Sequence, residues 1–370
     1  MAFQTSGLSE RSANFAAYIH KHRLNWEKRQ EAPREIFTRA AQEGLLGLET
    51  ATSFGGLGAS FLDKVELARL QSHQSMPAVF ALINSQNVAA RLRLSPHTKH
   101  HQLADELLTA DRIGCTALTE PHAGSDFGAI KTTATKKGNG WVLNGTKAWI
   151  TNAAHADTIM LYAQTDADKG WRGIASFVID ARKAGFRRGE IYKLIGGHAI
   201  GAGEFHLEDY LAPEEDLLSP PGDAFKFAMN SINGARTYVA SMCVGMMENA
   251  LDLATNYAKD RQAFGQNLLT HQGYRWSLGD VATHIAALSA LTDKAAQLIN
   301  AGEDAVLAAA MAKKMAGEVT IPSLTACMQA MGANGLREEH FLGQHLAAAK
   351  IAAFTDGSTE MMKERIGAYL

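Results

Sequence analysis

Two short segments carry the side chains best able to do chemistry together. The first, Ala117–Asp126 (ALTEPHAGSD), is a turn, because Pro121 lacks a backbone donor and Gly124 permits a positive φ. Thr119 adds a hydroxyl group to this turn. The second, Trp149–Asn152 (WITN), begins 23 residues later and puts an indole beside a hydroxyl group at the end of an expected strand. Polar donors next to an aromatic wall suit a planar heteroaromatic ligand such as a flavin.

These two segments, in this order and at this spacing, resemble the signature of the acyl-CoA dehydrogenase flavoproteins. The resemblance covers nearly the whole chain through four more motifs, which are Gly55–Ser60 (GG-x-G-x-S), Arg261–Gly265 with His271 and Gln272 (R-x-x-F-G), Gln329–Gly335 (Q-x-x-G-G-x-G) and Asp356–Glu360 (E-G-T-x-[EQ]). It implies FAD as the cofactor and α,β-dehydrogenation of an acyl thioester carried by coenzyme A or by an acyl carrier protein. It also implies a homotetramer that passes electrons to an electron-transfer flavoprotein.

The resemblance assigns roles to individual residues. Leu118 and Thr119 would lie at the flavin ring, and Trp149 and Thr151 would cover its edge and face. Groups from a neighbouring subunit would hold the pyrophosphate and adenosine half of FAD. The residues assigned to the cofactor are Leu118, Thr119, Ser125, Trp149, Thr151, Arg261, Phe264, Gln272, Gln329, Gly332, Ser358 and Glu360, and those assigned to the substrate are Ser125, Arg236 and Gly357.

The catalytic base is the point at which the chain departs from the family. Removing the α proton of a thioester requires a carboxylate within hydrogen-bond reach, while a hydride leaves the β carbon for the flavin. The family usually has glutamate before G-T, and this chain has Asp356. Some members place the glutamate immediately before the arginine that matches Arg236, but Ala235 occupies that position. Asp356 is therefore the predicted base, and burial is expected to raise its pKa.

Aspartate is one methylene shorter than glutamate, a deficit of about 1.5 Å, and a misplacement near 1 Å costs on the order of 100-fold in rate. Three interpretations stay open: a pocket that holds a cyclic or α-branched acyl group closer, a more acidic substrate as in nitroalkane oxidases, or a weakly active paralogue that depends on a partner. An exposed aspartate that caps a turn is the alternative without catalysis. Two further departures are Ala333 in the glycine pair and the missing Arg-Asp in His345–Lys350.

Composition narrows the class of protein. The 370 residues carry a formal net charge of −2, so the composition shows no excess of positive charge that would favour binding to nucleic acid or to an anionic membrane. No apolar stretch approaches 18 residues, so no membrane span is predicted. The histidines show no spacing typical of metal ligands. Three separated cysteines, Cys115, Cys243 and Cys327, indicate reduced thiols, and no signal peptide is visible, so a cytoplasmic protein is expected.

The pattern along the chain indicates three blocks that position these residues. Residues 1–110 and 223–370 show helical spacing of apolar residues, for example in the window Val281–Leu298. Residues 112–215 contain short β-type runs, with a hairpin turn at Gly138–Gly140 and a linker around Pro213–Gly222. We expect a mostly helical α+β fold: a helical domain (1–112), a small β-barrel-like domain (113–220) and a C-terminal four-helix bundle (221–370). No G-x-G-x-x-G follows a strand, so a Rossmann-type site is not supported.

Overall fold

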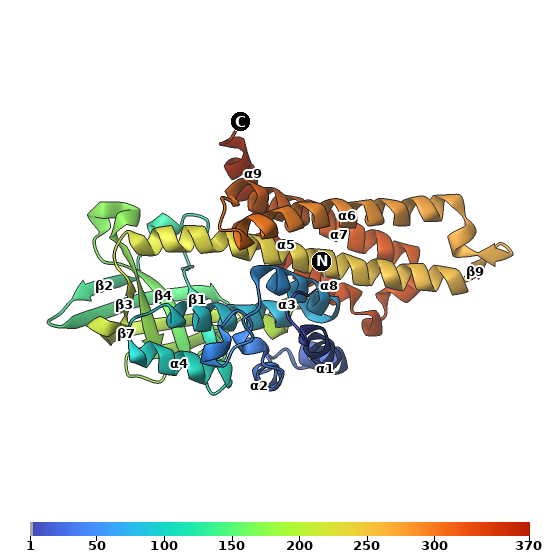
Figure 1. Ribbon diagram of the computed structural model, residues 1–370. Helices are drawn as coiled ribbons and strands as arrows, with labels where there is room; N and C mark the ends of the chain where they lie inside the picture. The colour runs from blue at the N-terminus through green and yellow to red at the C-terminus, as the bar shows by residue number, and fades with distance from the viewer. Residues whose placement is uncertain (1–2) are drawn as a thin grey trace.

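Figure 1 shows the computed structural model of the protein, which describes residues 3–370. Helices, then a sheet, then helices follow one another along the chain, which confirms the predicted fold class. The helices are α1 (Leu8–Arg29), α2 (Glu35–Gln42), α3 (Phe61–Arg93), α4 (Thr98–Leu108), α5 (Asp223–Asp260), α6 (Gln272–Asn300), α7 (Val306–Ala330), α8 (Leu342–Phe354) and α9 (Thr359–Gly367).

Helix α3 joins the first helical block to both of the others. Ser60 caps its start, since the hydroxyl accepts from the Asp63 N–H at 3.1 Å while the Asp63 carboxylate accepts from the Ser60 N–H. The helix is interrupted at Ser75, which has φ −165° and ψ 102°, two residues before Pro77. Proline lacks the amide hydrogen and clashes with the preceding turn, which explains the kink. Helix α3 packs against α5 and against the first strand.

The middle block is one mixed sheet. Its strands are β1 (Gly114–Ala117), β2 (Thr133–Lys136), β3 (Gly140–Ile150), β4 (Thr158–Gln164), β5 (Ile174–Asp180), β6 (Phe186–Ile191), β7 (Gly203–Pro213) and β8 (Leu217–Ser219). The order is β6-β7-β3-β2-β4-β5-β8, and β1 pairs in parallel with β4. Strands β2 and β3 are antiparallel with Lys136 opposite Trp141, so the hairpin predicted at Gly138–Gly140 is confirmed.

The predicted linker is only partly a linker. Leu217–Ser219 form β8, which pairs with β5 through Ser176 and Phe177. A strand of three residues between prolines gives little periodic signal, and proline is tolerated at a sheet edge. The chain therefore leaves the sheet only at Pro220.

The C-terminal block is built on α5, whose 38 residues span about 57 Å. It runs from beside the sheet to a small hairpin of β9 (Gln262–Ala263) and β10 (Gln266–Asn267) at the opposite end of the molecule (Figure 1). Helix α6 returns alongside it, and α7 then turns back and packs against both α5 and α6. Val281, Leu288 and Ala295 of α6 are buried, which confirms the predicted helical stripe. All three cysteines are free and buried, as expected.

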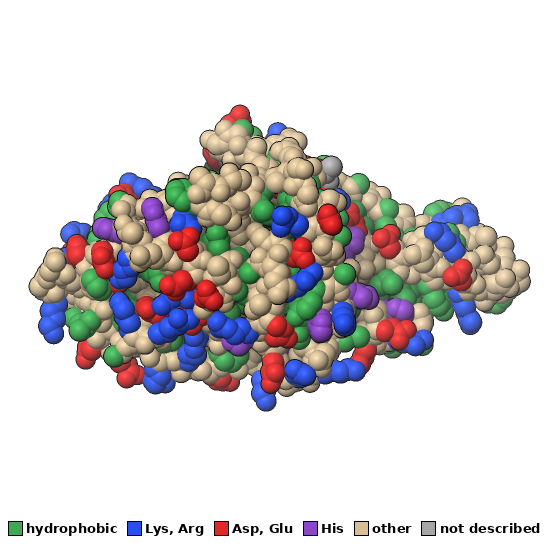
Figure 2. All heavy atoms as spheres, turned by 60° about the horizontal axis from the view of Figure 1, so that its bottom comes forward, with side chains coloured by type: hydrophobic (Ala, Val, Ile, Leu, Met, Phe, Trp, Pro, Cys, Tyr) green, Lys and Arg blue, Asp and Glu red, His purple; other side chains and the backbone are tan. Residues whose placement is uncertain are grey.

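On the face that Figure 2 shows, acidic and basic side chains are interspersed, and no large patch carries charges of one sign only. This distribution agrees with the small net charge. Within residues 3–370, none of the helices combines the length and the apolar character needed to cross a bilayer.

Candidate active site

The two motif segments are joined directly in the structure. The Ala148 N–H donates to the Thr119 carbonyl at 3.1 Å, and Lys147 Nζ donates to the Leu118 carbonyl at 2.9 Å. Lys147 also forms a buried ion pair with Glu120 at 2.8 Å. These contacts fix Leu118 and Thr119 beside the end of β3, so the turn and Trp149 form one wall.

The Lys147–Glu120 pair is satisfied on both sides. Glu120 accepts further hydrogen bonds from the Lys131 N–H at 2.6 Å and the Thr132 N–H at 2.9 Å. Burial alone would raise the pKa of Glu120, but Lys147 and the backbone donors lower it below its ordinary value. Sequence reasoning missed both residues, although each lies inside or next to a motif. A cation and an anion 27 residues apart give no signal of contact until the strands are paired.

Trp149 is held open to solvent at the end of β3. Its φ of 58° is unusual for a bulky residue, and the side chain is 61% exposed. The indole lies 4.4 Å, centroid to centroid, from the ring of Tyr192. Asn152 anchors the turn, because its Nδ2 donates to the carbonyls of Ala81 at 2.8 Å and Gly114 at 2.9 Å. Buried Thr151 lies within this anchored turn, whereas Ser125 lies exposed in the loop after Glu120.

The base candidate, Asp356, follows α8 in a tight turn. Its φ is 55°, a left-handed conformation that aspartate tolerates better than most residues, and Gly357 follows with φ 99°. Arg236 Nε donates to the Asp356 carbonyl at 3.1 Å, and Lys313 Nζ lies 3.3 Å from the Gly357 carbonyl. Ser358 then caps α9 by accepting from the Met361 N–H. Two buried cations thus fix this loop by its backbone.

The electrostatics of Asp356 match those of a general base. Its Oδ2 atom is buried and has no hydrogen-bond partner among residues 3–370. Burial raises the pKa of Asp356 to about 6, while the charges of Lys313 and Arg236 limit the rise. The Asp356 N–H also has no acceptor within the described part of the chain. An exposed aspartate that only caps a turn does not fit these observations. Sequence reasoning missed Lys313, because the sequence does not distinguish this buried lysine from its neighbour Lys314, which pairs with Glu318.

The remaining predicted cofactor residues lie far away on the same chain. Arg261, Phe264 and Gln272 surround the hairpin at the end of α5, and exposed Gln329 and Gly332 lie at the end of α7. Phe264 is 98% exposed with φ 53°. From Arg236 to Arg261 the helix rises about 38 Å. One small cofactor cannot touch both ends, so these residues complete a site only if they face another copy.

The segment that follows Tyr192 packs against α8, the helix that leads into the base loop. A Cβ added at Gly197, in the loop after Tyr192, would lie 2.8 Å from Ile351 on the helix that leads into Asp356. The observed residues fit a flavin: an exposed aromatic wall, a neighbouring hydroxyl, and a buried carboxylate without a partner. Glu360 is exposed beyond the loop, and its pKa is lowered by backbone and Ser358 hydrogen bonds.

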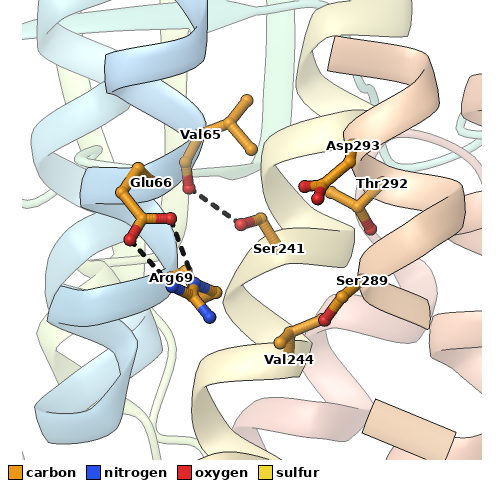
Figure 3. Close-up of a pocket in the computed structure, with 8 residues that line it drawn as sticks. All are labelled: Val65, Glu66, Arg69, Ser241, Val244, Ser289, Thr292 and Asp293. Carbon is orange, nitrogen blue, oxygen red and sulfur yellow. Dashed lines mark hydrogen bonds and ion pairs between the residues drawn. The ribbon is translucent and has the colours of Figure 1, made fainter. Parts of the chain in front are cut away.

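A small enclosed cavity lies apart from this site. It lies between α3, α5 and α6, has a volume of about 30 Å³, and is lined in part by the Glu66–Arg69 ion pair and Asp293 (Figure 3). That volume is enough for one or two water molecules. Neither the wall nor Asp356 contributes to it.

Comparison with known proteins decides the family. Profiles of the acyl-CoA dehydrogenase N-terminal, middle and C-terminal domains match residues 8–101, 115–210 and 222–370. The chain belongs to the acyl-CoA dehydrogenase family. It is an oxidoreductase that acts on the CH–CH bond of acyl-CoA, and the members of this family are FAD-binding flavoproteins.

Relatives cover almost the whole of this family member. It is 30% identical to an acyl-CoA dehydrogenase of Bacillus subtilis (strain 168), over 93% of this chain and 91% of that protein. It is 31% identical to the mitochondrial short/branched chain specific acyl-CoA dehydrogenase of Rattus norvegicus, over 93% and 80%. Among solved structures, butyryl-CoA dehydrogenase from Megasphaera elsdenii matches with a TM-score of 0.92 at 26% identity, over 100% and 99%. A chain solved in work on the electron transferring flavoprotein of Acidaminococcus fermentans also gives 0.92, at 29% identity over 100% and 99%.

Proposed function

We propose that this chain is an FAD-dependent acyl-CoA dehydrogenase in which Asp356 removes the α proton. The observation that carries the proposal is the buried Asp356 carboxylate, whose Oδ2 has no partner in residues 3–370. A carboxylate with a pKa of about 6 is ionised at neutral pH and still basic enough to accept a proton efficiently. The family homology supports the reaction, and the loop geometry supports the residue.

The protein groups divide the work of the reaction. Asp356 Oδ2 takes the proton from the α carbon, and the Asp356 N–H donates to the thioester carbonyl, which acidifies that proton. Arg236 and Lys313 act as positioning residues, because they hold the Asp356 and Gly357 carbonyls and keep the loop in its left-handed turn. Trp149 and the Leu118–Thr119 turn form the wall for the isoalloxazine ring. When bound, FAD supplies the acceptor for the hydride that leaves the β carbon.

The assembly and the electron acceptor belong to the same proposal. The distance between Arg236 and the hairpin of Arg261 and Phe264 supports a homotetramer in which each chain completes its neighbour's FAD site with that hairpin, Gln272, Gln329 and Gly332. The likeness to a chain solved in work on an electron transferring flavoprotein supports such a flavoprotein as the acceptor. The short side chain of Asp356 and the homology to a short/branched chain specific enzyme favour a branched or cyclic acyl group.

An anaerobic screen tests the function. Straight, branched and cyclic acyl-CoAs, and the same acyl groups on an acyl carrier protein, are mixed with the FAD-loaded protein, and bleaching of the flavin absorbance is followed. Asp356→Asn should slow bleaching by about 100-fold or more, because it removes the base. Asp356→Glu should retain activity on straight-chain thioesters and lose it on bulky ones. Full activity in Asp356→Asn would remove Asp356 from the mechanism.

The short aspartate also favours a second candidate, a flavin oxidase that acts on a nitroalkane or another small carbon acid. Such a substrate is more acidic than an acyl thioester, so a shorter carboxylate can still remove its proton. Hydrogen peroxide formation from nitroethane, without bleaching by any acyl thioester, would establish this reaction instead. A paralogue without turnover would bleach with neither class of substrate.

A further inference from the structure

A chain of polar side chains, partly or fully buried, links α3 to α5 close to Asp356. Lys64 forms an ion pair with Glu49, and Lys64 Nζ donates to Asn87 Oδ1 at 2.7 Å. Asn87 Nδ2 in turn donates to the hydroxyl oxygen of Tyr238 at 3.2 Å. Lys64 and Tyr238 are both almost fully buried, at 2% and 4% exposed. Burying so many polar groups between two helices is costly unless each finds a partner.

The orientation of these groups leaves the hydroxyl proton of Tyr238 without an acceptor. Lysine only donates, so Asn87 must present its oxygen to Lys64 and its NH2 group to Tyr238. Because the Tyr238 oxygen accepts that bond, its own proton points elsewhere. None of residues 3–370 accepts it. Asn84, one turn before Asn87 on the same face of α3, accepts from the Thr116 N–H at 2.9 Å, and its NH2 group likewise has no acceptor in the described chain.

The cluster lies between the two halves of the active site. Tyr238 is two residues after Arg236, which holds the Asp356 carbonyl, and one turn after Ala235 on α5. Burial and the Asp356 carboxylate both raise the pKa of the Tyr238 hydroxyl, which places the two groups in one region of low dielectric. On the other side, Thr116 lies two residues before Leu118 of the flavin wall. Asn84 and Asn87 are only partly buried, whereas Ile83, Ser85, Gln86 and Val88 beside them are buried, so both asparagines border space that the chain does not fill.

We propose that Tyr238, Asn84 and Asn87 line the acyl end of the site and select an acyl group that carries an uncharged hydrogen-bonding substituent, such as a hydroxyl or an amide. The inference rests on the proposed dehydrogenation and names its substrate class. A plain alkyl chain would desolvate the Tyr238 hydroxyl and the Asn84 amide without replacing their hydrogen bonds. Within this cluster a carboxylate would find no spare positive charge, because Glu49 already balances Lys64. The Lys64–Glu49 pair acts by fixing the orientation of Asn87.

Matched thioesters test the inference. Butyryl-CoA is compared with 4-hydroxybutyryl-CoA, pentanoyl-CoA with 5-hydroxypentanoyl-CoA, and glutaryl-CoA serves as the charged analogue. The readouts are kcat/KM from flavin reduction and the Kd of the corresponding enoyl thioesters from calorimetry, which does not depend on turnover. The wild-type protein should prefer a hydroxylated member over its alkyl partner by about tenfold or more, the effect of one satisfied hydrogen bond, and should bind the charged analogue least well.

Two variants locate the preference. Tyr238→Phe and Asn87→Leu should each bring the ratio of kcat/KM for the hydroxylated thioester to kcat/KM for its alkyl partner down to about one, because both remove hydrogen-bonding groups of the cluster. Tyr162→Phe, which removes another buried tyrosine hydroxyl from β4, should keep the preference. Equal or better binding of the alkyl thioesters by the wild-type protein would overturn the inference, as would an equal loss for both members of a pair in Tyr238→Phe. If calorimetry shows the preference but no thioester bleaches the flavin, the proposed reaction fails and the inference stands.

Discussion

Replacing Lys313 with methionine should move the acid limb of the pH–rate profile to higher pH. Lys313 is fully buried in α7, and its Nζ lies 3.3 Å from the carbonyl of Gly357, the residue after the base. Its positive charge lowers the pKa of Asp356 against the larger effect of burial. Methionine fills a similar volume without the charge. The variant therefore removes one electrostatic contribution and keeps most of the packing.

The size of the shift follows from the charges. With a pKa of about 6, roughly a tenth of Asp356 is ionised at pH 5, whereas an unperturbed aspartate would be almost fully ionised there. At an effective dielectric constant near 20, two opposite charges interact by roughly 4 kcal/mol at about 4 Å and by about half as much at twice that separation. Since 1.36 kcal/mol corresponds to one pKa unit, the limb should move up by on the order of one pH unit.

The assay is kcat/KM for an acyl-CoA between pH 4.5 and 8.5, since this parameter reports the ionisation of the free enzyme. Lys314→Met is the matched control, because Lys314 is the next residue and pairs with Glu318 on the surface. It should leave the limb in place. The reasoning is refuted if Lys313→Met keeps the wild-type limb, or if the limb of the wild-type protein lies near pH 4.

Three further predictions concern stability and assembly. Asp356→Asn should raise the apparent Tm at pH 8 but not at pH 4. The pKa of Asp356 is raised from 3.8 to about 6, so ionisation of this carboxyl group destabilises the fold by about 3 kcal/mol above pH 6 and not below pH 4. An equal change in Tm at both pH values would contradict this prediction. Lys147→Met should lower the free energy of unfolding by about 3–5 kcal/mol, because it leaves Glu120 buried without its cation. Thermal unfolding should show that the double variant with Glu120→Gln recovers part of this stability. An unchanged stability in Lys147→Met would disprove the role of the pair. Phe264→Ala should change the Tm of the FAD-free protein by little, because the Phe264 ring is exposed. The variant should nevertheless retain less FAD after gel filtration. Unchanged retention would argue that Phe264 does not contribute to the FAD site of a neighbouring chain.

The helical blocks and the sheet could be predicted because their signals are local. Apolar spacing located α6, and the glycines at Gly138–Gly140 located the β2–β3 turn. β8 escaped prediction because three residues next to prolines carry almost no periodicity. Its identity as a strand depends on the edge that β5 offers it.

Some features of the candidate site, like some elements of the fold, can be predicted from local sequence, and others cannot. The motifs around Trp149 and Asp356 are enough to predict a flavin and a base from residue types alone. The folded chain adds that Lys147 and Glu120 join the two halves of the wall, that Arg236 and Lys313 hold the base loop, and that the Arg261 hairpin lies about 38 Å away from it. These features could not be predicted from the sequence, because a pKa, an ion pair and the distance between two groups depend on contacts and burial that residues far apart in the chain acquire only when it folds.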